Sequence, residues 1–317
     1  MTSKHSRLDQ STARTISIAS RQNKVELEAF GRPHRPGGSF ADYFDALPDL
    51  LAGKEVREVV AAIVAARRDG KPVIVALGAH VIKVGLSPIL IDLLERSVIT
   101  ALATNGAGAI HDTEVALFGV TSEDVSAGIA SGEFGMVKES CAFINTATKE
   151  AATSDCGLGE MLGRKLFDAT APNAHLSLLA AAHHLGVPMT VHVAIGSDIN
   201  HMHPDFDGAA AGAASQTDFQ IFAAQVAQLV NGGVLMNIGS SVVLPTVIEK
   251  SIALSRNLGH EVGGFVGVNL DFIKHYRSGW NPVRRAEELG GKGYTLVGHH
   301  ELLVPLIAAA VVERLTD

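Results

Sequence analysis

One stretch of the chain places small residues and an ionisable pair between a predicted strand and a helix. Thr104-Asn105-Gly106-Ala107-Gly108-Ala109-Ile110-His111-Asp112 follows the apolar run 98–103 and leads into a helix-like segment, 113–118. Glycines at such a turn let the backbone approach a phosphate, and the helix N-terminus supplies free N–H groups. The spacing Gly-x-Gly-x-x-His is not the full dinucleotide fingerprint. A tight turn without a ligand is the alternative, and the His111-Asp112 pair favours a ligand.

Small or polar residues also follow other predicted strands. The segments that do so are Gly78-Ala79-His80, Gly196-Ser197-Asp198, Gly239-Ser240-Ser241 and Asn269-Leu270-Asp271. In open α/β sheets, ligands bind at the carboxyl ends of the strands. We therefore expect one nucleotide-type cleft at that edge. Its predicted cofactor-binding residues are Asn105, Gly106, Gly108, Asp112, Asp198, Gly239, Ser240 and Asp271.

Two groups of ionisable residues allow alternative interpretations. Asp198 is suited to accept hydrogen bonds from ribose hydroxyls or to hold a cationic substrate, but it also suits a helix cap. His201-Met202-His203-Pro204-Asp205 places two imidazoles at i and i+2, where they point to one side of an extended segment and can share a metal. The sequence fixes no third ligand. Polar lining of the cleft, without a bound metal, is the favoured interpretation.

Lys292 lies among glycines, in Gly290-Gly291-Lys292-Gly293. Such a lysine is either a solvated loop residue or a nucleophile whose pKa is lowered by burial or by neighbouring positive charge. The pair His299-His300 precedes Glu301 at the start of the last predicted helix. These histidines suit a helix start or an interface as well as catalysis.

Strands and helices alternate along most of the chain. Apolar runs predict strands at 73–77, 98–103, 189–194, 234–238, 265–268 and 294–297. This alternation predicts an α/β fold with a mostly parallel sheet and helices on both faces. Residues 1–38 are polar and predict an extended arm, and 39–317 predict a single α/β nucleotide-binding catalytic domain.

The composition excludes several classes of protein. The net charge of -7 argues against a general nucleic-acid surface. No uncharged apolar stretch approaches the roughly 18 residues of a membrane span, and the N-terminal residues lack the apolar core of a signal peptide. We therefore expect a cytoplasmic protein that acts on a small molecule. Cys141 and Cys156 are expected to be buried small hydrophobic residues.

The order of the motifs resembles the deoxyhypusine synthase family over roughly residues 70 to 315. Four blocks carry the resemblance, namely Gly78-Ala79-His80 with Gly85-Leu86-Ser87-Pro88, the Ala103–Asp112 segment, Val187-Pro188 with Gly196-Ser197-Asp198, and Ser278-Gly279 with Asn281-Pro282, Gly291-Lys292 and Leu302-Leu303-Val304-Pro305-Leu306. The resemblance implies a Rossmann-like domain that binds NAD and a homotetramer with sites at dimer interfaces. It also places the family's catalytic lysine on Lys292.

Departures from the family pattern concern its polyamine site. Asn237 or Ile238 stands where the family has a catalytic histidine, and Gly290 or Gly291 replaces a tryptophan. Arg277 replaces an acidic residue that grips an amine. Since an arginine repels a polyamine and suits a carboxylate or phosphate, we expect an anionic substrate rather than spermidine.

The favoured hypothesis is a deoxyhypusine synthase-like, NAD-dependent enzyme that acts on an amine- or hydroxyl-bearing carbon. Lys292, His111 and His203 are its candidate catalytic residues, with Lys292 forming an imine in the family's manner. One alternative is a metal-assisted hydrolase that uses His201, His203 and Asp205. Another is a non-catalytic NAD-binding sensor.

Overall fold

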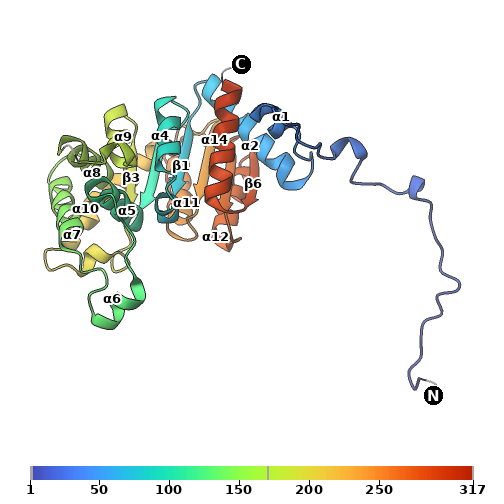
Figure 1. The fold of residues 1–317 in the computed structure, drawn as a ribbon, viewed down its shortest axis with the longest axis horizontal. Coiled ribbons are helices and arrows are strands. Elements are labelled where there is room, and N and C mark those ends of the chain that lie inside the picture. Colours follow the sequence, from blue (N-terminus) through green and yellow to red (C-terminus); the bar gives the residue numbers. More distant parts are fainter. Residues whose placement is uncertain (1–2, 170, 316–317) are drawn as a thin grey trace.

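Six parallel strands form one sheet in the computed structural model, which describes residues 3–169 and 171–315. The strand order is β3-β2-β1-β4-β5-β6, and helices cover both faces of the sheet (Figure 1). The predicted α/β class is therefore confirmed. The strands are β1 (Val73–Leu77), β2 (Ala101–Asn105), β3 (Met189–His192), β4 (Val234–Ile238), β5 (Val266–Asp271) and β6 (Lys292–Val297).

The longer helices lie before, between and after these strands, and several of them separate β2 from β3. They are α2 (Leu51–Arg68), α4 (Ser87–Glu95), α5 (Gly106–Phe118), α7 (Lys138–Ala152), α8 (Leu158–Asp168), α9 (Leu178–Leu185), α10 (Gly208–Val226), α11 (Val243–Asn257) and α14 (His300–Leu315). Shorter helical segments are α1 (Phe40–Asp45), α3 (Ala79–Lys83), α6 (Val125–Ser131), α12 (Tyr276–Ser278), α13 (Arg285–Glu288), η3 (Ala174–Leu176), η4 (Ile199–Met202) and η5 (Gly279–Arg284).

Strand β1 lies at the centre and determines where the sheet reverses its order. Leu77 at its end is in register with Thr104 of β2 and with Ile238 of β4. The chain proceeds outward from β1 through β2 to β3, and then returns to build β4, β5 and β6 on the other side. In doubly wound sheets a crevice opens between the strands at such a reversal, which here are β1 and β4.

Side chains that alternate along the strands pack into two separate apolar clusters, one on each face of the sheet. Val73, Val75 and Leu77 pack with residues of α2, α4 and α14, whereas Ile74 and Ala76 pack with residues of α10 and α11. All of β1 and all of β4 are buried. Continuous apolar runs are what strands covered on both faces require.

Helix α8 was not predicted, and its glycines explain why. A Cβ on Gly159 would lie 2.0 Å from the Met189 carbonyl oxygen, and one on Gly163 would lie 2.4 Å from that of Leu179. These glycines let α8 approach β3 and α9 closely. In the sequence they interrupt the apolar pattern and disfavour a helix.

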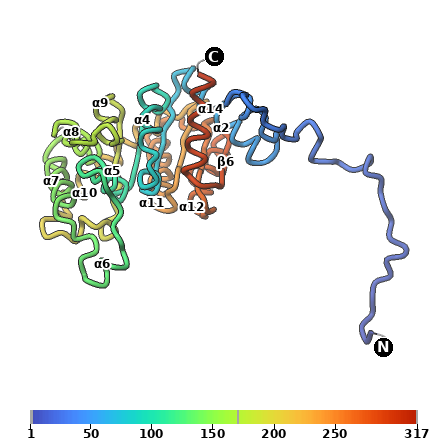
Figure 2. Tube along the Cα trace, in the orientation of Figure 1, coloured from blue at the N-terminus to red at the C-terminus, as the bar shows by residue number. Residues whose placement is uncertain are grey.

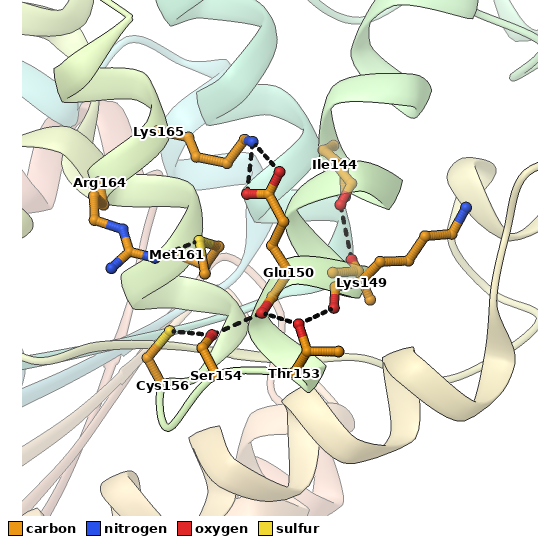
Figure 3. A network of polar contacts seen from close by, with 10 residues as sticks. Ile144, Lys149, Glu150, Thr153, Ser154, Cys156, Met161, Arg164 and Lys165 are labelled. Carbon is orange, nitrogen blue, oxygen red and sulfur yellow. Dashed lines mark hydrogen bonds and ion pairs between the residues drawn. The ribbon is translucent and has the colours of Figure 1, made fainter.

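Polar contacts around one turn fix the approach of α7 to α8 (Figure 3). Lys165 donates to both carboxylate oxygens of Glu150 at 2.7 Å, and Ser154 Oγ donates to the Glu150 carbonyl oxygen at 2.7 Å. Ser154 Oγ also lies 3.3 Å from Cys156 Sγ. Cys156 and Cys141 are both buried, as predicted.

The N-terminal segment runs away from the sheet and its helices (Figures 1 and 2). Residues 3–28 are exposed, and the backbone first bonds to the following helices where Ala29 accepts from the Asp49 N–H. Helix α1 begins after Ser39, whose side chain forms a reciprocal capping box with Asp42. Among the described residues no helix combines the length and the apolar character that crossing a membrane requires.

Candidate functional site

Two glycines form the floor of the site where β1 and β4 end. Gly78 follows β1 and Gly239 follows β4. A Cβ on Gly78 would lie 2.1 Å from the Gly239 carbonyl oxygen, so the two turns touch through their backbones. Gly239 has a φ of +66°, which favours glycine, and a Cβ there would lie 2.7 Å from Cε1 of His300.

A pair of histidines lies directly against this floor. His80 of α3 and His300, the first residue of α14, approach with their Nδ1 atoms 2.9 Å apart. His300 is completely buried and His80 is half-buried. Phe272, which follows β5, lies with its ring centroid 5.5 Å from that of His80 and 5.6 Å from that of His300. The pair therefore joins the ends of β1, β4, β5 and β6.

The surroundings of His300 set its protonation. Burial lowers the pKa of His300, and Asp271 opposes that shift. The His300 Nε2 atom lies 3.9 Å from Asp271 Oδ1, beyond hydrogen-bond distance, and is buried without a partner. One of the two facing Nδ1 atoms must carry the proton. If His80 donates, His300 Nε2 carries a proton that faces Asp271, and His80 Nε2 has a free lone pair.

Asp198 fills the space beside Gly106, the first residue of α5. A Cβ on Gly106 would lie 2.0 Å from Asp198 Oδ2. Burial raises the pKa of Asp198 to about 6, and the N–H groups of Ala107 and Ala194 partly offset that shift. The Oδ2 atom has no hydrogen-bond partner, and the His201 Nε2 atom, which also lacks one, lies 3.8 Å away.

This geometry decides which parts of a nucleotide fit here. The N-terminus of α5 already holds a carboxylate, so a phosphate does not fit at Gly106 while Asp198 is in place. The unpaired Oδ2 atom is instead an acceptor for a hydroxyl group, as a ribose provides. Asp198 takes the cap position before η4 that the sequence allowed, and its unpaired Oδ2 atom also leaves it free to accept from a hydroxyl group, whereas Gly106 does not fit the phosphate-binding role.

The other predicted residues of this turn, and Ser240 of the turn after β4, form contacts within the fold. The Asn105 side chain accepts from the Gly108 N–H at 2.9 Å and caps α5, and a Cβ on Gly108 would lie 2.0 Å from Thr104 Oγ1. Asp112 is completely buried and binds the N-terminus of α9. The structure therefore corrects the assignment of Asp112 to the cofactor cleft. Ser240 Oγ accepts from the Leu244 N–H at 3.3 Å and so supports the start of α11.

His111 and His203 do not lie with the His80–His300 pair. His111 Nδ1 lies 2.5 Å from Thr121 Oγ1, which itself donates to Glu114. Burial, followed by the charge of Lys83, lowers the pKa of His111 to about 4. His203 Nδ1 is hydrogen-bonded to Asp205, whose Oδ1 atom also accepts from Asn145 at 2.7 Å. Both histidines are thus held by local hydrogen bonds.

The His201–His203 segment does not converge on a metal position. His201 Nδ1 accepts from the backbone N–H groups of Gly196 and Asp198, while His203 pairs with Asp205. Within residues 3–169 and 171–315, no three His, Cys, Asp or Glu side chains are arranged to hold a metal ion. The arrangement gives the hydrolase alternative no support.

Lys292 lies at the opposite edge of the sheet from the histidine pair. It is exposed, it is the first residue of β6, and it is in register with Val266, the first residue of β5. The carboxyl ends of the parallel strands lie at the other edge. The strand therefore places Lys292 away from the carboxyl ends at which the other candidate residues lie, and within this chain Lys292 does not lie with the histidine pair.

Asn237 is one of the two residues, with Ile238, that stand where the family pattern has a histidine. Its side-chain N–H2 donates to Asn269 Oδ1 at 2.7 Å and to the Ser240 carbonyl oxygen at 2.8 Å. Sequence reasoning noted His80 and His300 without assigning them a joint role. Their positions could have suggested such a role, since each histidine follows the end of a predicted strand.

No family model and no curated protein matches the sequence. Among solved structures, a protein of Methanococcus maripaludis S2 assigned as LOR/SDH has a similar fold, with a TM-score of 0.50 and 16% identity over 83% of this chain and 70% of that one. The complex of AgrE with ornithine and NAD+ gives a TM-score of 0.52 and 14% identity over 82% of this chain. This chain covers 33% of AgrE, about a third of its length.

A protein of Entamoeba histolytica assigned as a deoxyhypusine synthase also has a related structure. It covers 89% of this chain and 96% of its own length, at 10% identity and a TM-score of 0.49. At such identities, the similarity to the LOR/SDH protein and to AgrE concerns the fold alone.

Proposed function

We propose that this protein is an NAD-dependent enzyme that oxidises an amine- or hydroxyl-bearing carbon of a small molecule. The observation that carries the proposal is the His80–His300 pair, which lies over Gly78 and Gly239 where the sheet reverses its order. Doubly wound sheets bind dinucleotides at that reversal. The AgrE structure, whose fold is similar, was obtained with ornithine and NAD+, and we extend the cofactor to this chain as part of the proposal.

Asp198 and the Gly239–Ser241 turn would hold the cofactor. The buried, unpaired Oδ2 atom of Asp198 would accept from a ribose hydroxyl. The turn after Gly239 would approach the pyrophosphate through its backbone, because Gly239 has a positive φ and carries no side chain of its own. When bound, NAD supplies a hydride acceptor.

The histidine pair would remove the proton that accompanies oxidation. In the tautomer in which His80 Nδ1–H donates to His300, His80 Nε2 has the free lone pair and would take the proton from the substrate nitrogen or oxygen. The positive charge that forms on His80 is shared through His300, and the Asp271 carboxylate 3.9 Å from His300 Nε2 stabilises it. A positioned general base of this kind contributes about 10²–10⁴ to a rate.

A lysine imine has no place in this proposal, because Lys292 lies at the other edge of the sheet. The chemistry we propose is therefore oxidation, and the transfer reaction that the family resemblance implied is set aside. The homotetramer also remains a proposal. Its support is the N-terminal arm, which runs away from the protomer and is free to lie on a neighbouring subunit (Figure 2).

Calorimetric titration with NAD tests the proposed cofactor, and NADH formation across a panel of amino and hydroxy acids tests the reaction. We expect Asp198→Asn to bind NAD about tenfold more weakly, because the ribose hydroxyl would then donate to a neutral amide oxygen in place of a carboxylate. We expect His80→Asn to bind NAD like the wild type and to turn over about 10²–10⁴ times more slowly. Failure of the wild type to bind NAD would overturn the proposal, and binding without turnover would favour the sensor.

A further inference from the structure

A pocket of about 620 Å³ lies near the carboxyl ends of β5 and β6. Its floor is Asn269 of β5 and Thr295 of β6, which are in register with each other. Their neighbours Leu270 and Leu296 pack in the apolar cluster that contains α2 and α14, so Asn269 and Thr295 face the other side of the sheet. The volume lies within the roughly 300–1,000 Å³ typical of small-molecule sites.

The walls of the pocket are rich in basic side chains. Lys274, His275 and Arg284 line it, and none of the lining residues is acidic. Arg284 pairs with Glu287 at 3.2 Å and with Glu288 at 3.6 Å. Lys274 and His275 make no ion pair within the described part of the chain. The pocket therefore presents uncompensated donors, which favour an anion.

Aromatic rings and a buried amide complete the lining. Trp280 and Tyr276 lie with ring centroids 6.1 Å apart, and the Arg284 guanidinium lies 6.0 Å from the Trp280 ring. Asn269 is only 1% exposed, and its Oδ1 atom accepts from Asn237. Among the described residues, no acceptor for the Asn269 N–H2 group is found, so this group remains available as a donor to a ligand.

We propose that this pocket binds the carboxylate or phosphate group of the substrate. The inference rests on the proposed function, because it makes this pocket the anchoring subsite of the same enzyme. Asn269 and Asp271 project from the same face of β5, about 7 Å apart along the strand. Asp271 Oδ1 in turn lies 3.9 Å from His300 Nε2, so an anionic group held over Asn269 lies on the face of β5 that leads toward the His80–His300 pair. Basic residues of the pocket, rather than Arg277, would give the anionic specificity.

Trp280 is the only tryptophan of the chain, so its fluorescence reports on this pocket directly. We would titrate the full-length protein with inorganic phosphate in one arm and with L-lactate and L-alanine in another. Chloride at matched ionic strength and spermidine serve as references. Saturable changes with phosphate alone identify a phosphate ester as the substrate class, and changes with the organic acids identify a carboxylate. Calorimetry with the same anions gives a second readout.

Variants connect the signal to the basic side chains. Lys274→Ala and His275→Ala should each weaken anion binding about tenfold, because each removes a charge-assisted or polar donor. Lys54→Ala, an exposed lysine of α2 on the opposite face of the sheet, should leave it unchanged. Equal affinity in Lys274→Ala and the wild type, or no saturable response to either kind of anion, would overturn the inference.

NADH binding, followed by its own fluorescence in the same samples, separates the two proposals. If NADH binds and the anions do not, the pocket inference fails and the proposed function stands. If the anions bind and NADH does not, the proposed function fails and the anion site stands alone.

Discussion

Asp198 holds the position beside α5 that a nucleotide phosphate takes in many α/β proteins. A carboxylate at a helix N-terminus is favourable, because the N–H groups there carry partial positive charge. The contact depends on Gly106, which alone leaves room for the Asp198 oxygen atoms. Glycine at this turn therefore makes room for a carboxylate of the protein itself. In the sequence, the same glycine had suggested room for the phosphate of a bound ligand.

Gly106→Ala should therefore destabilise the protein. The new Cβ would lie 2.0 Å from Asp198 Oδ2, so either Asp198 or α5 must move. We expect a loss of about 1–3 kcal/mol in the free energy of unfolding, measured by urea denaturation. Gly212→Ala in α10 is the matched control, since nothing lies within 4 Å of a Cβ there. A gain of up to about 1 kcal/mol is expected for the control. Equal effects of both changes would contradict the role of Gly106.

At the scale of elements, α5 and α9 are joined by a single buried carboxylate. Asp112 of α5 accepts from Ser177 Oγ at 2.5 Å, from the Leu178 N–H at 2.8 Å and from the Leu179 N–H at 3.1 Å. Free N–H groups at the N-terminus of α9 thereby find their acceptor on another helix. The candidate site depends indirectly on the contact between Asp112 and α9, because α5 also carries Gly106, beside which Asp198 lies.

Asp112→Ala should lower the free energy of unfolding by about 3 kcal/mol, because it leaves buried donors without an acceptor. Ser177→Ala removes one of these bonds and a helix cap, and should cost about 1 kcal/mol. Urea denaturation of both variants measures the difference. A cost for Asp112→Ala no larger than that for Ser177→Ala would show that Asp112 does not hold α9.

At the scale of the whole molecule, buried ionisable groups make stability depend on pH in opposing directions. Burial raises the pKa of Asp218 to about 7, and it lowers the pKa of His192 to about 4. Asp218 accepts from the Gly159 and Val191 N–H groups and so connects α8, β3 and α10. Above the ordinary value near 3.8, the unfolded chain releases a proton that folded Asp218 retains.

The contribution of Asp218 to stability should therefore be present at low pH and be lost as the pH rises from about 4 to about 7. Asp218→Asn removes this titration. Relative to the variant, the wild type should lose about 4 kcal/mol between pH 4 and pH 8. Taking the difference between the two proteins cancels the opposite effect of the histidines. Urea midpoints at several pH values give the profile, and parallel profiles would contradict the assignment.

Local pattern was sufficient to predict the layers of this fold. The runs 73–77 and 234–238 are continuous and apolar because helices cover both faces of their strands, and both were predicted with the observed bounds. Helix α8 escaped prediction because Gly159 and Gly163 serve packing against other elements. A requirement of that kind is set by the neighbouring elements and leaves no periodic signal in the chain.

The composition of the site was partly visible in the sequence, but its assembly was not. Residues following strands were rightly expected to gather at one edge, since parallel strands end together. Lys292 lies at the other edge because its strand begins with it, and its place directly before the predicted strand 294–297 was the signal available in the sequence. His80 and His300 lie 220 residues apart in the chain, and only the strand order brings their rings together. The sequence thus determined which chemical groups are present and the class of fold, whereas the tertiary structure decided which of them meet.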